Sequence, residues 1–171
     1  MLNPYEHDDA DMLVKGVEGI IEPVTELIGR ARDEGVETIY VNDNYGDWTA
    51  SRQSLVHGAL EGRRPDLVEP VLPPDDVSLV MKARHSIFYG TPLEYLLGQL
   101  EIDHLVLVGQ VTEQCILYSA LDAYVRHLRA TVPPDGVAPI HQNLADAALE
   151  MMERNLGARL SPCAECTLSE A

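Results

Sequence analysis

The sequence predicts a single α/β domain of three layers, in which helices cover both faces of a parallel sheet. Three short apolar runs rich in β-branched residues have the character of buried strands, namely VETIYVND, DDVSLVMKA and IDHLVLVG. Segments with helical periodicity alternate with these runs, which is typical of parallel sheets. The 171 residues, 46% of them hydrophobic, suffice for one core. No repeat or linker divides residues 1–171.

Helices are predicted where apolar residues recur every three or four positions. The first covers residues 11–32, in which Pro23 is expected to kink or split the helix. Two more are predicted between strands, over residues 92–100 and 112–128, and a fourth over residues 143–155. A weaker strand is expected within RATVPPDGVAPI, and GARLS is expected to add a last short strand.

The start of the chain departs from the usual order of an open α/β sheet, which begins with a buried strand. This chain begins with the turn-like NPYEHDDAD and continues directly into a helix. We therefore expect further sequence to precede Met1 in the intact protein.

Charge and composition limit the expected partners. Twenty-eight acidic residues against twelve Lys and Arg give a net charge of −16, which repels nucleic-acid phosphates and anionic lipid headgroups. No apolar run approaches the roughly 18 residues of a membrane span, and no basic stretch leads into a signal core. We expect a cytoplasmic protein with a small-molecule substrate, no nucleic-acid or membrane partner, and three reduced cysteines.

Chemically active side chains follow three of the predicted strands. Asp43 and Asn44 come after the first, Lys82 ends the second, and the segment after Gly109 follows the third. Ligands bind at the carboxyl ends of strands in open parallel sheets. These stretches are therefore expected to meet at one edge of the sheet.

Cys115 is the candidate nucleophile at this edge. It lies three residues after Thr112, a good N-cap residue, which predicts a thiol in the first turn of a helix. The unpaired N–H groups of a first turn favour a thiolate, and Lys82 is expected to add to this effect. The same groups can stabilise the oxyanion that forms when a thiolate attacks a carbonyl carbon.

The alternative for Cys115 is a small core residue, the commonest role of a lone Cys on a helix packed against a sheet. The polar entry turn favours the nucleophile, since the buried face of this helix is expected to consist of Ile116, Leu117, Ala120, Tyr124 and Leu128. Lys82 also has an alternative, because a Lys that ends a strand usually points to solvent.

Two motifs resemble those of the isochorismatase-like cysteine hydrolases, a family that includes nicotinamidases and N-carbamoylsarcosine amidases. GQVTEQC resembles the family's G-x-x-T-x-x-C motif, and KARHSIF resembles its K-x-x-x-S-x-F stretch. MLNPY resembles the tail of its first motif, in which an Asp ends the first strand immediately before the Met. The resemblance implies a six-stranded parallel sheet, with Cys115 as nucleophile and Lys82 as charge partner.

The general base that the resemblance implies is an Asp that would precede Met1, as would the family's first strand. Asp43 is a candidate substitute acid, and Asp8 and Asp9 are further candidates. The resemblance also implies a cis peptide between Val111 and Thr112, which would direct the N–H of Val111 at the oxyanion.

Neither a metal nor an organic cofactor is predicted. Asp43 and Asp47 have no nearby His until His57, which is not a convincing ligand set. Cys163 and Cys166 form one C-x-x-C near the C-terminus, which we interpret as tail residues. The chain has no glycine-rich nucleotide motif and no G-x-S-x-G.

The predicted function is the hydrolysis of a small amide or related C–N bond through a covalent Cys115 intermediate. A catalytically silent scaffold or binding protein is the alternative, because the family's Asp is absent from the sequence. Candidate walls of the substrate pocket are Tyr5, Asn44, Trp48 and Phe88, with Tyr89 beside them, although a core position is equally good for any one aromatic. A homo-oligomer, a dimer or tetramer, is expected from the resemblance and the apolar Ile87-Phe88-Tyr89.

Overall fold

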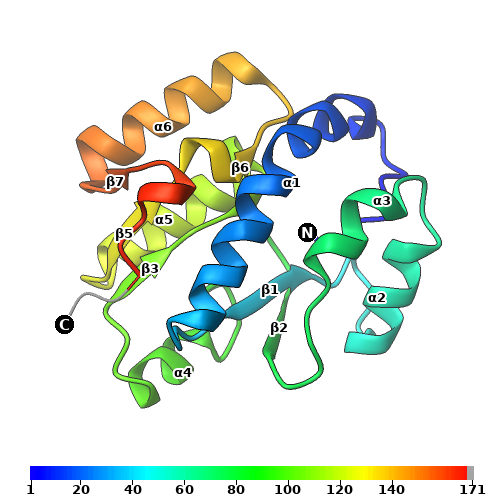
Figure 1. Ribbon diagram of the computed structural model, residues 1–171, viewed down its shortest axis with the longest axis horizontal. Coiled ribbons are helices and arrows are strands. Elements are labelled where there is room, and N and C mark those ends of the chain that lie inside the picture. The colour runs from blue at the N-terminus through cyan, green and yellow to red at the C-terminus, as the bar shows by residue number, and fades with distance from the viewer. Residues whose placement is uncertain (169–171) are drawn as a thin grey trace.

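The computed structural model describes residues 1–168, which form parallel strands packed against helices (Figure 1). The mixed α/β fold that the sequence predicts is confirmed. The helices are α1 (Ala10–Asp33), α2 (Arg52–Leu60), α3 (Pro65–Val68), α4 (Leu93–Gln99), α5 (Leu117–Val125) and α6 (Gln142–Leu156). The strands are β1 (Ile39–Asp43), β2 (Ser78–Lys82), β3 (His104–Val106), β4 (Gly109–Gln110), β5 (Arg129–Val132), β6 (Val137–Ala138) and β7 (Arg159–Leu160).

The strands form three separate parallel ladders in place of the one continuous sheet that was expected. β1 pairs with β2, β4 pairs with β6, and β5 lies between β3 and β7. Only Leu107 and Val108 separate β3 from β4, and Leu107 N donates to Thr131 O (2.9 Å), so β3 and β4 follow one another along one edge. Within residues 1–168, no strand joins β1 to β3.

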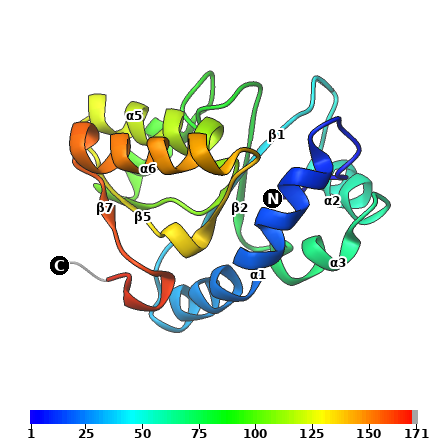
Figure 2. The same cartoon turned by 90° about the horizontal axis from the view of Figure 1, so that it is seen from above.

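Helix α1 supplies the largest apolar face and matches its predicted bounds closely. Its buried residues are Ala10, Leu13, Val17, Ile20, Val24, Leu27 and Ala31, the spacing expected of one helix face. The helix continues through Pro23, so the predicted split does not occur. In Figure 2, α1 lies on one side of the strands and α5 lies on the other.

Helix α5 buries a narrower face than the sequence suggested. Ser119, Ala120 and Ala123 are its buried residues, whereas Tyr124, which was expected in the core, is exposed. Ala120 packs with Ala148 and Met152 of α6, whereas Ala123 packs with Leu93 and Leu97 of α4. Ala123 takes the inward position of this turn, which leaves its neighbour Tyr124 on the outside.

Helices α2 and α3 were missed in the sequence, because both are short and weakly amphipathic. A capping box starts α2: Ser54 N donates to Ser51 Oγ (3.1 Å), and Ser51 N donates to Ser54 Oγ (2.8 Å). Pro65 occupies the first turn of α3, where its missing N–H costs nothing. The Ser-x-x-Ser spacing and Pro65 were the features of the sequence that indicate where α2 and α3 begin.

Gly62, between these helices, makes room for the N-terminal segment, which gives a stability prediction. A Cβ at Gly62 would lie 2.5 Å from Pro4 Cα, so Gly62→Ala must displace backbone and should lower the free energy of unfolding by about 1–3 kcal/mol. In the control Gly58→Ala, the Cβ meets nothing within 4 Å, and the helical position should gain up to about 1 kcal/mol. Urea unfolding measures both, and equal stabilities would contradict this packing.

Among residues 1–168, no helix combines the length and the apolar character that crossing a membrane requires.

Candidate active site

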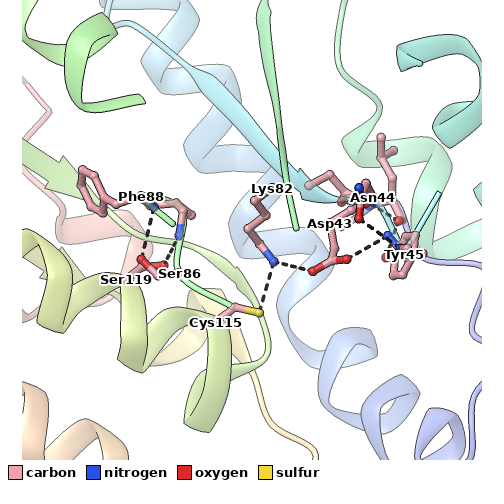
Figure 3. Close-up of polar contacts among 12 residues, drawn as sticks. Asp43, Asn44, Tyr45, Lys82, Ser86, Phe88, Cys115 and Ser119 are labelled. Carbon is pink, nitrogen blue, oxygen red and sulfur yellow. Dashed lines mark hydrogen bonds and ion pairs between the residues drawn. The ribbon is translucent and has the colours of Figure 1, made fainter. Parts of the chain in front are cut away.

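Three polar side chains from three separate elements meet at the carboxyl edge of the strands (Figure 3). Lys82 Nζ donates to Asp43 Oδ2 (3.0 Å) and to Cys115 Sγ (3.6 Å). Asp43 and Lys82 are neighbours because β1 and β2 pair in register, with Asp43 opposite Lys82. Cys115 reaches them from the turn between β4 and α5. The predicted meeting of Asp43, Lys82 and Cys115 at one edge therefore occurs in the structure.

Lys82 is enclosed by its partners and does not point to solvent. Its side chain is 5% exposed, whereas that of Asp43 is 28% exposed. Removing an ammonium group from water is costly unless an opposite charge and hydrogen bonds compensate it. Asp43 supplies this compensation, and it holds the Lys82 ammonium at the Cys115 sulfur.

The turn that carries Cys115 differs from the predicted first turn of an α-helix. Residues Thr112–Ile116 form one π-helical turn before α5, and its N-cap is Val111, not Thr112. The amides of Gln114 and Ile116 both donate to Val111 O (3.1 Å each). Thr112 is buried and its Oγ1 has no hydrogen-bond partner among the described residues, so the predicted cap is wrong.

The predicted cis peptide is misplaced by one residue. The cis bond joins Gln110 to Val111, whereas the expectation placed it between Val111 and Thr112. The expectation came from the family resemblance and not from a cap preference. Because Val111 and not Thr112 precedes the helical turn as its N-cap, the junction between strand and turn lies one residue earlier.

The N-terminal residues dock beside this site through Asn42 and Tyr45. The Met1 amino group and Leu2 N both donate to Asn42 Oδ1 (3.1 and 3.0 Å), and Asn42 Nδ2 donates to Leu2 O (3.1 Å). Tyr45 Oη also donates to Leu2 O (2.7 Å). Burial, and next the charge of Lys82, lowers the pKa of the Met1 amino group to about 5. Asn42 was missed in the sequence, because a polar residue near a strand end carries no information on a partner 40 residues away.

Comparison with known proteins assigns the fold to a family. The family model described as "Isochorismatase domain" matches residues 8–165. The chain belongs to the isochorismatase family. It is 33% identical to the uncharacterized isochorismatase family protein YaaI of Bacillus subtilis, over 94% of this chain and 89% of that protein. As a member of the isochorismatase family, the chain is a hydrolase.

Solved structures of family members have the same fold. An N-carbamoylsarcosine amidase from Thermoplasma acidophilum matches with a TM-score of 0.70 and 26% identity, over 89% of this chain and 87% of that one. The nicotinamidase SaPncA from Staphylococcus aureus matches with a TM-score of 0.68 and 25% identity, over 86% of this chain and 84% of that one.

The residues predicted to line the pocket of this isochorismatase-family chain are dispersed. Asn44 is buried and accepts a hydrogen bond from Gly46 N (3.0 Å). Tyr5 is fully buried, with its hydroxyl 3.3 Å from Gln110 Oε1. Trp48 is 82% exposed. Phe88 packs in a core cluster with Leu93, Leu97 and Ala123, and its ring points away from Lys82 in Figure 3. The structure therefore does not bring Trp48 and Phe88 together beside Cys115.

Two serine side chains hold the loop after Lys82, namely Ser86 of the KARHSIF stretch and Ser119, which the sequence did not single out. Ser119 Oγ on α5 accepts a hydrogen bond from Ile87 N (3.1 Å), and Ser86 Oγ accepts one from Phe88 N (3.2 Å).

Ile87, Phe88 and Tyr89 were the predicted oligomer contacts. Phe88 is buried, and only Tyr89 among the three is largely exposed, at 63%.

Glu113 anchors the turn that carries Cys115. Its Oε1 accepts hydrogen bonds from Ile140 N (3.1 Å) and His141 N (2.7 Å), just before α6. This carboxylate also lies near the start of the α6 dipole, a favourable place for negative charge. The residue within the GQVTEQC motif therefore fixes the turn to a second helix, a contact that sequence spacing does not show.

Candidate metal ligands do not gather in the part of the chain that the structure describes. Within residues 1–168, no three His, Cys, Asp or Glu side chains are placed to hold a metal ion. The Asp47 carboxylate accepts hydrogen bonds from the Thr49 hydroxyl (2.7 Å) and amide (2.8 Å), which hold the pKa of Asp47 below its usual range. His57 pairs with Glu61 on the surface of α2.

Cys163 and Cys166, which were interpreted as tail residues, are buried in the core. Both are buried and pack against Leu27 of α1. The Arg30 guanidinium binds the carbonyl oxygens of Cys163 and Cys166 (2.9 Å each), which fixes this segment to α1. Burial, and next the Asp135 carboxylate, raises the pKa of Cys163 to about 12 and also raises that of Cys166.

The three thiols should therefore react at different rates. At pH 7 to 9, iodoacetamide should alkylate Cys115 about tenfold or more faster than Cys163 or Cys166, because the buried pair retains its protons up to a higher pH. Peptide mass spectrometry of timed samples measures the three rates, and urea provides the control in which all thiols become accessible. Equal rates in the folded protein would contradict the assignment of Cys115 as the reactive thiol.

Proposed function

We propose that the protein hydrolyses a small amide or related C–N bond through a covalent thioester on Cys115. The observation that carries the proposal is the contact of Lys82 Nζ with both Cys115 Sγ (3.6 Å) and Asp43 Oδ2 (3.0 Å). A lone core cysteine has no need of a buried ammonium beside its sulfur. Membership in a hydrolase family and the likeness to a nicotinamidase and an N-carbamoylsarcosine amidase support the same class of substrate.

The proposed reaction has two halves. A carboxylate accepts the thiol proton, and the Lys82 ammonium stabilises the thiolate by its charge. The thiolate then attacks the carbonyl carbon, the C–N bond breaks, and the amine leaves with the transferred proton. In the second half the carboxylate deprotonates water, which attacks the thioester. The carboxylic acid product leaves, and the catalytic carboxyl group returns its proton to the Cys115 sulfur, which restores the thiol.

Asp43 is the carboxylate that the described chain offers for this role. It contacts Lys82 directly, and its partial exposure leaves a path for water. Lys82 lies between Asp43 and the sulfur in Figure 3, so proton transfer from the thiol to Asp43 requires a movement or a bridging water. We therefore propose that Asp43 serves as a slow substitute for a base placed directly at Cys115.

The test is the dependence of turnover on Cys115. A panel of small amides that includes nicotinamide and N-carbamoyl compounds would be assayed with the parent chain, Cys115→Ala and the control Cys163→Ala. We expect hydrolysis by the parent and Cys163→Ala, and none above background by Cys115→Ala. A rate unchanged by Cys115→Ala would exclude the nucleophile. No hydrolysis, together with no acylation of Cys115 by an activated ester, would favour a silent scaffold or binding protein.

A further inference from the structure

Glu113 connects the turn that carries Cys115 to the segment before α6. We propose that Glu113 is a positioning residue, whose carboxylate sets the distance between the Cys115 sulfur and the Lys82 ammonium. The inference deepens the proposed function, because it rests on Cys115 as the reactive thiol and adds a residue that acts on this thiol through the backbone of the turn.

The two sides of the contact between Lys82 and Cys115 belong to different ladders. Lys82 ends β2, which pairs with β1, whereas Cys115 follows β4, which pairs with β6. Within residues 1–168, no ladder hydrogen bond joins these two pairs of strands. The 3.6 Å between Lys82 Nζ and Cys115 Sγ therefore depends on how the turn is held on the β4–β6 side (Figure 3).

The hydrogen bonds of Glu113 leave the turn and reach a separate part of the chain. Inside the turn, the amides of Gln114 and Ile116 share a single acceptor, the carbonyl oxygen of Val111. Glu113 Oε1 accepts two hydrogen bonds from the backbone just before α6, at 2.7 and 3.1 Å. Because Glu113 lies two residues before Cys115, a shift of its carboxylate is passed to the sulfur through the backbone.

The segment before α6 is itself held at three points. Ala138 pairs with Gln110 of β4, the strand that leads into the turn. A Cβ at Gly16 of α1 would lie only 2.9 Å from Pro139 O, so α1 packs tightly against this segment. Ile140 packs against the apolar cluster of α1. The carboxylate therefore closes a ring of contacts from β4 through the turn and back to β6, which limits the positions open to the sulfur.

Helix α6 gives Glu113 an alternative role as a cap. Its N-cap, His141, makes no side-chain cap hydrogen bond, and its first turn contains no acidic residue. The Glu113 carboxylate supplies an acceptor for the backbone before this turn and a negative charge near the positive end of the helix dipole. A cap depends mainly on the charge, whereas positioning depends on the reach of the side chain, so the two roles can be separated.

Two conservative substitutions separate reach from charge. Glu113→Asp retains the charge but is one methylene shorter, so the turn must shift before both hydrogen bonds can form. Glu113→Gln retains the reach and one oxygen acceptor but removes the charge. Since a displacement of about 1 Å can cost about 100-fold in rate, we expect Glu113→Asp to lower kcat on the amide panel by about 10- to 100-fold, with KM within about threefold of the parent. Glu113→Gln should restore kcat to within about threefold.

Alkylation of Cys115 by iodoacetamide at pH 7 gives a second readout that requires no turnover. A sulfur displaced from Lys82 loses its neighbouring positive charge, so we expect Glu113→Asp to slow alkylation by about fivefold or more and Glu113→Gln to match the parent. Rates are measured in folded protein below the thermal midpoint. If Cys115 proves not to be the nucleophile, this pattern of alkylation still supports the positioning role, so failure of one proposal is distinguished from failure of the other.

Three results would overturn the positioning role of Glu113. Alkylation of Glu113→Asp at the rate of the parent would show that the turn does not depend on the reach of the side chain. Alkylation slowed in Glu113→Gln as much as in Glu113→Asp, or more, would show that the charge at α6 is what matters. A lowered thermal midpoint with unchanged alkylation and unchanged kcat would make Glu113 a cap of α6 alone.

Discussion

An extension that ends in Asp immediately before Met1 is expected to raise amide turnover by about 100 to 10,000-fold over the matched extension that ends in Asn, the usual range of general-base catalysis. Both extensions should affect the fold equally, since Asp and Asn are nearly isosteric. Only Asp places a carboxylate at the Met1 nitrogen, which is buried near Lys82 and Cys115. The resemblance of the motifs implies an acid at this position, and the charges of Lys82 and Cys115 both act on the Met1 amino group.

The measurement is kcat/KM on the amide panel for both extensions and for the unextended chain. Cys115→Ala in the Asp-ended form is the control for non-enzymatic hydrolysis. If the unextended chain equals the Asp-ended form and still depends on Cys115, then Asp43 is a fully competent base. The account of an acid before Met1 would then be wrong.

Lys82→Met is expected to lower kcat/KM by about 100 to 1,000-fold, the usual effect of removing one preorganised electrostatic contact in an active site. Met retains the apolar stem, but it removes the ammonium that contacts Asp43 and Cys115. Alkylation of Cys115 should slow in the same variant, because the thiolate loses its neighbouring positive charge. Lys15, the only other Lys in the chain and an exposed one, gives the matched control Lys15→Met.

The two readouts separate a catalytic role of Lys82 from a structural one. A structural role would lower the thermal midpoint and leave the alkylation rate of Cys115 in the folded protein unchanged. Alkylation and turnover equal to those of Lys15→Met would contradict the proposed electrostatic role.

Periodicity and strand character predicted most of the fold. The face of α1 and the strands β1 and β2 were predictable because long apolar patterns dominate their local energetics. Helices α2 and α3 were not, since a Ser-Ser capping box and one Pro are weak signals. The separation into ladders could not be predicted in detail, because it depends on which edges find partners within the chain.

The site was predictable to the extent that topology determines it. Strand ends of a parallel sheet share one edge, which brought Lys82 to Cys115. The support from Asn42, Glu113 and Ser119 was not predictable, because their partners lie far away in the sequence. The cap was misplaced by one residue, since side-chain preference alone did not show that Val111 precedes the turn. The cis bond, which was expected from the resemblance, was also misplaced by one residue.

The most direct test of the central claim is to trap the intermediate on Cys115. The chain would be mixed with a small amide or its activated ester, quenched in acid within the first turnovers and digested, and the peptide that carries Cys115 would be weighed. The account predicts an increase equal to the acyl group on this peptide, which hydroxylamine removes and which Cys115→Ala does not form. Turnover that proceeds with no acyl group on Cys115, or with the acyl group on another residue, would contradict it.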